Sequence, residues 1–153
     1  MDIQGKRTPI IIAIALLWAA ITVLGWYEMY MPGLFLGVIL MFLHMVLGVS
    51  IKNKVSKKFL IYPLLPWAVI WAVSFYLSDI HSKMFAGVMP DFTILGFHPS
   101  FSWTVILYWI GGVLTLTLGF VALKDEWLSE KDWEEFKGKV QKIDERQKGG
   151  QQS

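Results

Sequence analysis

The sequence IKNKVSKK, from Ile51 to Lys58, carries four lysines between two long apolar runs. The run before it ends at Ser50, and the run after it begins at Phe59. Lysine-rich connectors between membrane-spanning segments stay on the cytoplasmic side, because ammonium groups cross hydrocarbon at a high energetic cost. We therefore expect both runs to be transmembrane helices that meet at the cytoplasmic face.

The rest of the composition agrees with a protein embedded in lipid. Apolar residues make up 55% of the chain, and the charged residues gather at its ends and in its connectors. About 20 apolar residues are needed for a helix to cross about 30 Å of hydrocarbon. Four such runs predict an all-α integral membrane protein in which residues 1–128 form two helical hairpins. The expected spans lie near residues 9–27, 32–50, 60–78 and 102–123.

The distribution of positive charge predicts the orientation. The two short segments expected inside hold six Lys and Arg residues, whereas the two expected outside hold only Lys83. This bias places both termini in the cytoplasm. The first apolar run is longer than that of a signal peptide, about 7 to 15 residues, so we expect it to be retained. The predicted location is the inner (plasma) membrane, as a multi-pass protein.

The residues do not form a recognisable catalytic constellation. The absence of cysteine excludes disulfides and thiolate metal sites. His81, His98, Asp79 and Asp91 lie in an irregular connector without a ligand-spacing motif, so a metal site there is conceivable but not predicted. No basic stripe is interleaved with aromatics. We expect no enzymatic activity, no cofactor, no metal and no nucleic-acid partner.

His44 is the one titratable side chain well inside a predicted span, about 18 Å from the outer end of that span. An ionisable group in hydrocarbon is a candidate functional residue by default. A hydrogen bond to Thr22, Ser74 or a neighbouring carbonyl would instead give it a structural role. The sequence leaves both interpretations of His44 open.

Small residues in the spans predict close helix packing. Gly111, Thr115 and Gly119 recur at every fourth position of the last span and form one narrow stripe. Such stripes let two helix backbones approach closely, although the partner helix can belong to this chain or to another. Gly33 and Gly37 repeat the spacing, but glycine is also common in membrane helices generally.

The connector between Ser78 and Trp103 is long and unusually apolar, and Phe92 and Phe97 are its candidate contact residues. Loops of this length are usually functional or disordered, and this one is too hydrophobic for disorder. It must pack against the outer ends of its own helices, the lipid interface or a partner protein.

The C-terminal region is polar and charged. Ser129 and Asp132 resemble a capping box at the start of a helix over residues 129–148. One narrow apolar face recurs along it at spacings of three and four, at Trp133, Phe136, Val140 and Ile143. This amphipathic helix can lie on the membrane or dock onto a protein, and its mixed charge favours docking. Residues 149–153 are expected to be disordered.

The second half of the chain resembles a known family. The quoted features are Phe75-Tyr76-Leu77 at the end of a tryptophan-rich span, MPDFTILGF from Met89 to Phe97, Phe101-Ser102-Trp103, and the acidic pair Asp125-Glu126. Together they are similar to the small auxiliary subunits of bacterial sodium:solute symporters. The similarity covers about Pro66 to Glu130. Those subunits resemble two-span hairpins, whereas this chain has an additional N-terminal hairpin.

The resemblance implies an accessory role that agrees with the residues. We expect a small subunit that associates with a larger membrane transporter through the stripe of Gly111, Thr115 and Gly119 and through the outer connector. The alternative is an independent small oligomeric transporter or channel with His44 near its pathway. The expected partners are the lipid bilayer and either a larger membrane protein or further copies of the chain.

Overall fold

The computed structural model describes residues 2–50 and 54–150, and within these ranges the chain is helical apart from turns, loops and isolated bridges. Lys52 of the lysine connector lies outside them. The elements are α1 (Arg7–Trp26), α2 (Tyr30–Gly48), α3 (Lys57–Phe59), the π-helical η1 (Leu60–Leu64), α4 (Leu65–Met84), α5 (Pro99–Trp103), the π-helical η2 (Thr104–Gly111), α6 (Gly112–Ala122), α7 (Lys124–Trp127) and α8 (Glu130–Gly150).

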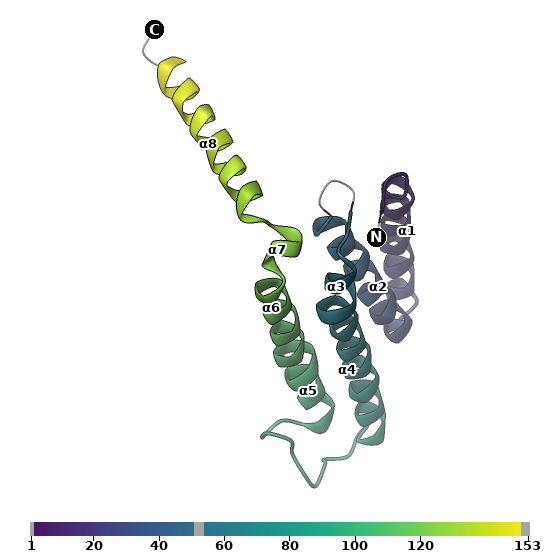
Figure 1. Ribbon diagram of the computed structural model, residues 1–153. Helices are drawn as coiled ribbons and strands as arrows, with labels where there is room; N and C mark the ends of the chain where they lie inside the picture. The colour runs from purple at the N-terminus through teal and green to yellow at the C-terminus, as the bar shows by residue number, and fades with distance from the viewer. Residues whose placement is uncertain (1, 51–53, 151–153) are drawn as a thin grey trace.

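Four continuous helices are long and apolar enough to cross a membrane, which confirms the predicted all-helical class. They cover Arg7–Trp26, Tyr30–Gly48, Lys57–Met84 and Pro99–Ala122. The first packs mainly against the second, the third packs against the fourth, and α2 also contacts α4. The helices therefore form two antiparallel hairpins that lie side by side (Figure 1).

The third helix is longer than predicted at both ends. It begins at Lys57, three residues before the expected start of the span, and Pro63 lies inside it, within the π-helical turn η1. An interior proline lacks an N–H and its ring presses on the preceding turn, and the wider π turn accommodates both defects. The helix also continues six residues beyond Ser78, to Met84. The apolar connector is therefore shorter than expected and comprises residues 85–98.

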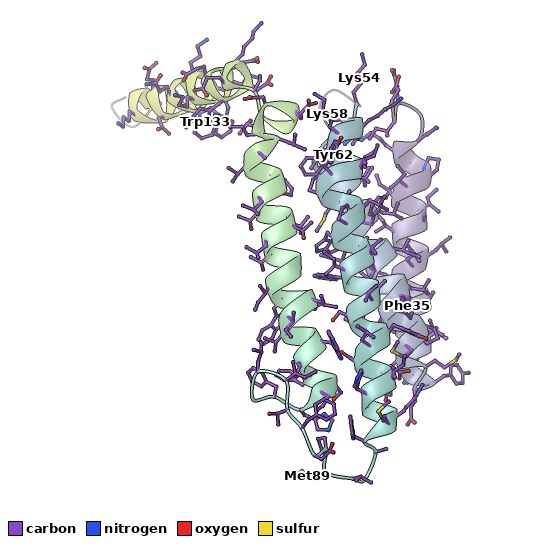
Figure 2. All side chains as sticks on the ribbon, turned by 60° about the horizontal axis from the view of Figure 1, so that its bottom comes forward. Phe35, Lys54, Lys58, Tyr62, Met89 and Trp133 are labelled. Atoms are coloured by element: carbon purple, nitrogen blue, oxygen red, sulfur yellow. The ribbon has the colours of Figure 1, made fainter. Side chains whose placement is uncertain are left out.

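The two ends of the hairpins differ in charge. The described Lys and Arg residues of the N-terminal segment and the lysine connector gather at one end, while Met89 lies at the tip of the other (Figure 2). At the lysine-rich end the side chains of Ile3, Val55 and Phe59 are buried in one cluster. The N-terminal segment is thereby held against the connector.

The last helix, α8, begins at a capping box as its sequence suggests. The Asp132 backbone N–H donates to Ser129 Oγ at 3.2 Å, and the Ser129 hydroxyl donates to the Asp132 carboxylate. The helix extends away from the four long helices (Figure 1). Gly149 and Gly150, expected in a disordered tail, are its final residues.

The third and fourth helices approach each other most closely at two glycines. A methyl group on Gly112 would overlap the Trp71 indole, and one on Gly119 would overlap the Pro63 ring. Ser74, which is fully buried, donates its hydroxyl to the Trp103 carbonyl across the same interface at 3.0 Å. Small residues on one helix thus receive large rings from the other.

We expect Gly119→Ala to destabilise the protein by about 1 to 3 kcal/mol, because overpacking against a rigid proline ring forces the helices apart. Gly37→Ala is the matched control, since no atom lies within 4 Å of the added methyl group and alanine favours a helix by up to about 1 kcal/mol. Thermal unfolding in detergent measures both. Equal stability of the two variants would contradict this packing.

Candidate functional site

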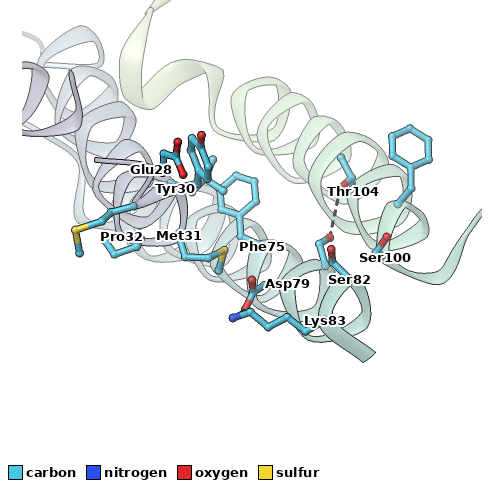
Figure 3. A pocket seen from close by; sticks show the side chains of 14 residues that line it. Glu28, Tyr30, Met31, Pro32, Phe75, Asp79, Ser82, Lys83, Ser100 and Thr104 are labelled. Carbon is cyan, nitrogen blue, oxygen red and sulfur yellow. Dashed lines mark hydrogen bonds and ion pairs between the residues drawn. The ribbon is translucent and has the colours of Figure 1, made fainter. Parts of the chain in front are cut away.

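Two adjoining cavities lie between the hairpins. The larger, which we call the loop-end chamber, has a volume of about 700 Å³ and is lined by the α1–α2 turn from Glu28 to Pro32, by Asp79 and Lys83 of α4, and by Thr104 (Figure 3). The second, the interhelical groove, has a volume of about 450 Å³ and runs between α1, α2, α4 and η2.

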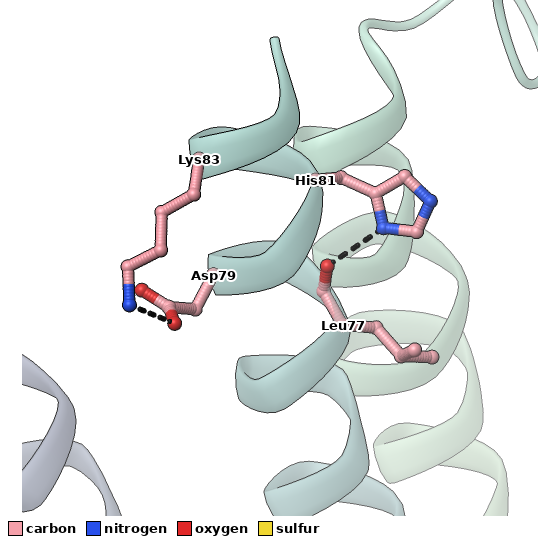
Figure 4. A network of polar contacts seen from close by, with 4 residues as sticks. All are labelled: Leu77, Asp79, His81 and Lys83. Atoms are coloured by element: carbon pink, nitrogen blue, oxygen red, sulfur yellow. Dashed lines mark hydrogen bonds and ion pairs between the residues drawn. The ribbon is translucent and has the colours of Figure 1, made fainter. Parts of the chain in front are cut away.

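The two cavities adjoin, and four residues line both: Met29, Tyr30, Leu34 and Phe75. The chamber is the polar part. Its wall includes the ion pair between Lys83 Nζ and Asp79 Oδ2, 2.7 Å apart on one face of α4 (Figure 4). Ser78 Oγ lies 3.4 Å from Thr104 Oγ1 and joins α4 to η2 beside it.

Glu28 occupies a strained position at the mouth of the chamber. Its backbone φ is 59°, in the left-handed region. The N–H of Met29 donates to the Leu24 carbonyl at 2.9 Å, and that of Glu28 to the Gly25 carbonyl at 3.2 Å. This pattern is a Schellman motif, in which glycine usually takes the left-handed residue. The Glu28 carboxylate has no partner among the residues that the structure describes.

The interhelical groove is apolar and has glycines in its floor. A methyl group on Gly33 would just reach Leu24 Cβ at 4.0 Å, and one on Gly37 would meet nothing within 4 Å. These glycines therefore leave space instead of bringing two helices into contact. Aromatic rings form the facing wall, where the ring centroids of Trp71 and Tyr108 lie 4.1 Å apart.

His44 lines neither cavity. Its Nδ1 lies 2.8 Å from the Leu40 carbonyl oxygen of its own helix, and the residue is exposed on the surface of α2. A hydrogen bond to a neighbouring carbonyl is the contact expected if His44 has a structural role. A role in a transport pathway stays a prediction.

The small-residue stripe packs within the chain. Gly111 faces Ile70, since an added methyl group would lie 3.2 Å from Ile70 Cγ2, and Gly119 faces Pro63. The Thr115 hydroxyl donates to the Gly111 carbonyl of its own helix at 2.6 Å. The third helix therefore covers part of the stripe, whose three residues remain partly exposed, and a contact with a partner stays a prediction.

Phe92 and Phe97 belong to a folded loop at the end opposite the lysines. Phe92 packs edge-on against Phe85 with centroids 5.8 Å apart, and Phe97 packs against Phe101 at 5.6 Å. The backbones of Ile94 and Phe97 exchange two hydrogen bonds, of 3.0 and 3.1 Å. The loop is thus ordered by its own aromatic contacts and by one tight turn.

The tight turn has an unusual residue at its corner. Leu95 and Gly96 have φ values of 54° and 80°, as in a type I′ turn, for which Asn-Gly is the preferred pair. The buried hydroxyl of Ser102 lies 3.0 Å from the carbonyl oxygens of both Ile94 and His98 and anchors the turn to α5. Leucine is therefore held in a strained conformation by its surroundings.

The other polar residues of this end do not converge. Among the residues that the structure describes, no group of three or more His, Cys, Asp or Glu could hold a metal ion. His81 Nδ1 lies 2.9 Å from the Leu77 carbonyl oxygen, and His98 Nδ1 accepts from the Ser100 N–H at 3.3 Å as the cap of α5. His98 thus caps the start of α5, whereas His81 lies in the last turn of α4, where Trp103 Nε1 is also 3.3 Å from its Nδ1.

The chamber could not be located from the sequence. Glu28 and the Asp79/Lys83 pair come from different hairpins, and Asp79 and Lys83 were expected in a connector and not on one helix face. Comparison with known proteins adds nothing further: no family model, curated protein or solved structure matches the chain. The resemblance to symporter subunits stays a prediction.

At the lysine-rich end, Glu126 of α7 contacts the start of the third helix. Hydrogen bonds from the Ser56 hydroxyl and the Lys58 ammonium, together with the charge of Lys58, hold the pKa of Glu126 below its usual value. Lys58 Nζ lies 3.2 Å from Glu126 Oε1. Ser56 also accepts from the Phe59 N–H and so caps α3.

Because the pKa of Glu126 is lowered in the folded state, its contact with Lys58 stabilises the position of α7 at pH values above the unfolded pKa. The stabilisation is lost as the pH falls through the lowered folded value. We expect the distribution of distances between spin labels on α7 and α3 to broaden when the pH falls below the ordinary pKa range of a carboxyl group. Glu126→Gln removes this pH dependence; a transition that persists in that variant would assign it to another group.

We also expect Glu28→Gly to stabilise the protein by about 1 kcal/mol, because glycine adopts the left-handed conformation without the side-chain clash. Glu28→Gln keeps the strain and is expected to leave the stability unchanged. Chemical or thermal unfolding in detergent measures the difference. Equal stability of the two variants would show that the turn relaxes around any residue.

Proposed function

We propose that the chain is a small integral membrane subunit that associates with a larger membrane transporter. In this proposal the four apolar helices span the inner membrane, and both termini are cytoplasmic. The main support is the folded loop of residues 85–98, which carries exposed apolar side chains beyond the ends of the helices.

The loop is the best candidate for the partner contact. Met89 is 91% exposed at its tip, and Leu95 is 71% exposed at its corner. The Ser102 anchor and the paired backbones of Ile94 and Phe97 order the turn that carries Leu95. Apolar residues presented by a rigid segment are typical of a binding surface. The loop's own helices do not cover them, which leaves lipid or a partner.

Charge supports the orientation. The described Lys and Arg residues near the membrane ends gather at the connector end, whereas Lys83 at the loop end is paired with Asp79. A cytoplasmic connector satisfies the bias of positive charge toward the inside. The loop then faces the periplasmic or extracellular side.

The amphipathic helix α8 offers a second contact surface. Trp133 and Phe136 stack with centroids 5.7 Å apart, and Lys137 Nζ lies 5.9 Å from the centre of the Trp133 ring. The apolar face of α8 remains exposed along its length. A helix of mixed charge with one narrow apolar face is suited to docking in a groove of a partner.

An independent transporter has less support. Ionisable groups within spans usually mark a pathway, but Asp79 is the one carboxylate in the four described spans and lies near the loop end. His44 is bonded to its own helix. Neither residue marks a path from one face of the membrane to the other.

The sharpest test replaces Leu95 with asparagine. Leu95→Asn introduces the residue that a type I′ turn prefers and removes the apolar side chain. We therefore expect the loop to stay folded. The amount of co-purified transporter should fall at least about tenfold, as for a central interface residue. A photoreactive residue at Met89 should cross-link to the same protein in native membranes.

The control is a photoreactive residue at Ile12 on the exposed face of α1, which should label lipid. Isolation of the chain alone in mild detergent, with Met89 cross-linked only to lipid, would contradict the proposal. Flux carried by the purified chain in liposomes and abolished by His44→Ala would favour the independent transporter instead.

A further inference from the structure

We propose that the loop-end chamber and the interhelical groove together bind one phospholipid with an ethanolamine head group. The head group lies in the chamber and one acyl chain lies in the groove. The inference does not depend on a partner protein. It rests on the adjacency of a charged cavity at the helix ends and an apolar cavity between the helices, which share four lining residues.

The chamber carries complementary charge for a zwitterion. Two carboxylates, Glu28 and Asp79, line it together with the single ammonium of Lys83, so its formal charge is −1. The unpartnered Glu28 is available to the ammonium group of ethanolamine. Lys83 is paired with Asp79, and its ammonium has three donors, so the remaining N–H groups are available to the phosphate. Charge-assisted hydrogen bonds of this kind are the strong ones. An anionic head group would meet a net negative chamber.

The chamber also offers neutral groups for a phosphate or glycerol oxygen. Ser82 and Ser100 line it from α4 and α5, and Thr104 lines it from η2 (Figure 3). The chamber lies at the ends of the helices, where Tyr30 contributes an aromatic ring to its wall. Tyrosine is enriched at the depth of lipid head groups. The polar cavity is therefore at the level where a head group would be.

The groove has the size of a small-molecule site. Its volume of about 450 Å³ falls in the range of ligand pockets, about 300 to 1,000 Å³. A transmembrane helix about 10 Å across and 30 Å long occupies roughly 2,400 Å³, so the groove could hold only one edge of it. An acyl chain is a thinner rod that fits between the glycines of α2 and the rings of Trp71 and Tyr108.

The strained backbone at Glu28 supports a role for its carboxylate in binding. Glycine would form the same Schellman motif without cost, yet glutamate occupies the position and directs a charged group to the chamber (Figure 3). Strained residues cluster at ligand sites, where the surrounding structure maintains them. Glu28 is exposed, so the missing protein partner leaves its carboxylate accessible, and the left-handed backbone is the observation that distinguishes this residue.

The experiment measures lipid retention on the full chain. The purified protein is mixed in mild detergent with equal amounts of phosphatidylethanolamine and phosphatidylglycerol of the same acyl chains, and native mass spectrometry counts the bound lipids. We expect one retained phosphatidylethanolamine with at least about tenfold preference. Phosphatidylcholine, whose ammonium has no N–H donor, should bind between the two.

Two variants and one control assign the site. Glu28→Gln should reduce the preference to about twofold or less, and Gly37→Leu, which fills the groove, should reduce retention of all three lipids. Asp91→Asn is the matched control, because Asp91 is a carboxylate of the same end that lines neither cavity. Glu28→Gln keeps the backbone and the side-chain shape, so its result stands even where Gly37→Leu does not fold.

Equal retention of the ethanolamine and glycerol lipids would overturn the proposal, as would an unchanged preference in Glu28→Gln. A co-purified polypeptide that protects residue 37 from a thiol probe in the variant Gly37→Cys, with no lipid retained, would show that the groove receives a helix instead. The loop variant Leu95→Asn is expected to leave lipid retention unchanged, which separates this test from the test of the proposed function.

Discussion

The contact on which the rest of the structure depends is the insertion of two rings of the third helix into glycines of the fourth. Pro63 packs on Gly119 and Trp71 packs on Gly112. In a bilayer no hydrophobic force drives helices together, so association depends on close packing and interhelical hydrogen bonds. The approach permits the Ser74 bond to the Trp103 carbonyl and sets where the following loop begins and ends.

The N-terminal hairpin lacks such a contact with the other two helices. Its glycines, Gly33 and Gly37, leave open space where the third and fourth helices use theirs for contact. The same residue type therefore has opposite uses in the two halves: it closes one interface and opens a cavity beside the other. Val38 and Val46 of α2 are nevertheless buried with Trp67 of the third helix, so the hairpins pack together there and the interhelical groove lies beside that contact. The chamber lies where that groove reaches the helix ends.

Much of the fold could be predicted from the sequence, because apolar run length and charge placement are properties of single segments. The four helices and the capping box of α8 follow from such local patterns. The π turn η1 that accommodates Pro63 inside the third helix could not be predicted, because no local pattern in the sequence marks where a helix widens. The chamber depends on Glu28 and Asp79, which different hairpins contribute, so no spacing in the sequence relates them. The stripe at Gly111 and Gly119 was visible, but its partner helix was not.

Two non-glycine residues have a left-handed backbone in the described chain, Glu28 and Leu95, and both lie at the loop end. Each occupies a turn in which glycine or asparagine would be less strained. One presents a carboxylate to a cavity, and the other presents an apolar side chain to the exterior. In the two proposals above, the carboxylate would contact a cationic group and the leucine an apolar surface. The backbone strain is found where these two side chains are displayed and not within the packed helices. Stability alone therefore explains the loop end less well than it explains the rest of the molecule.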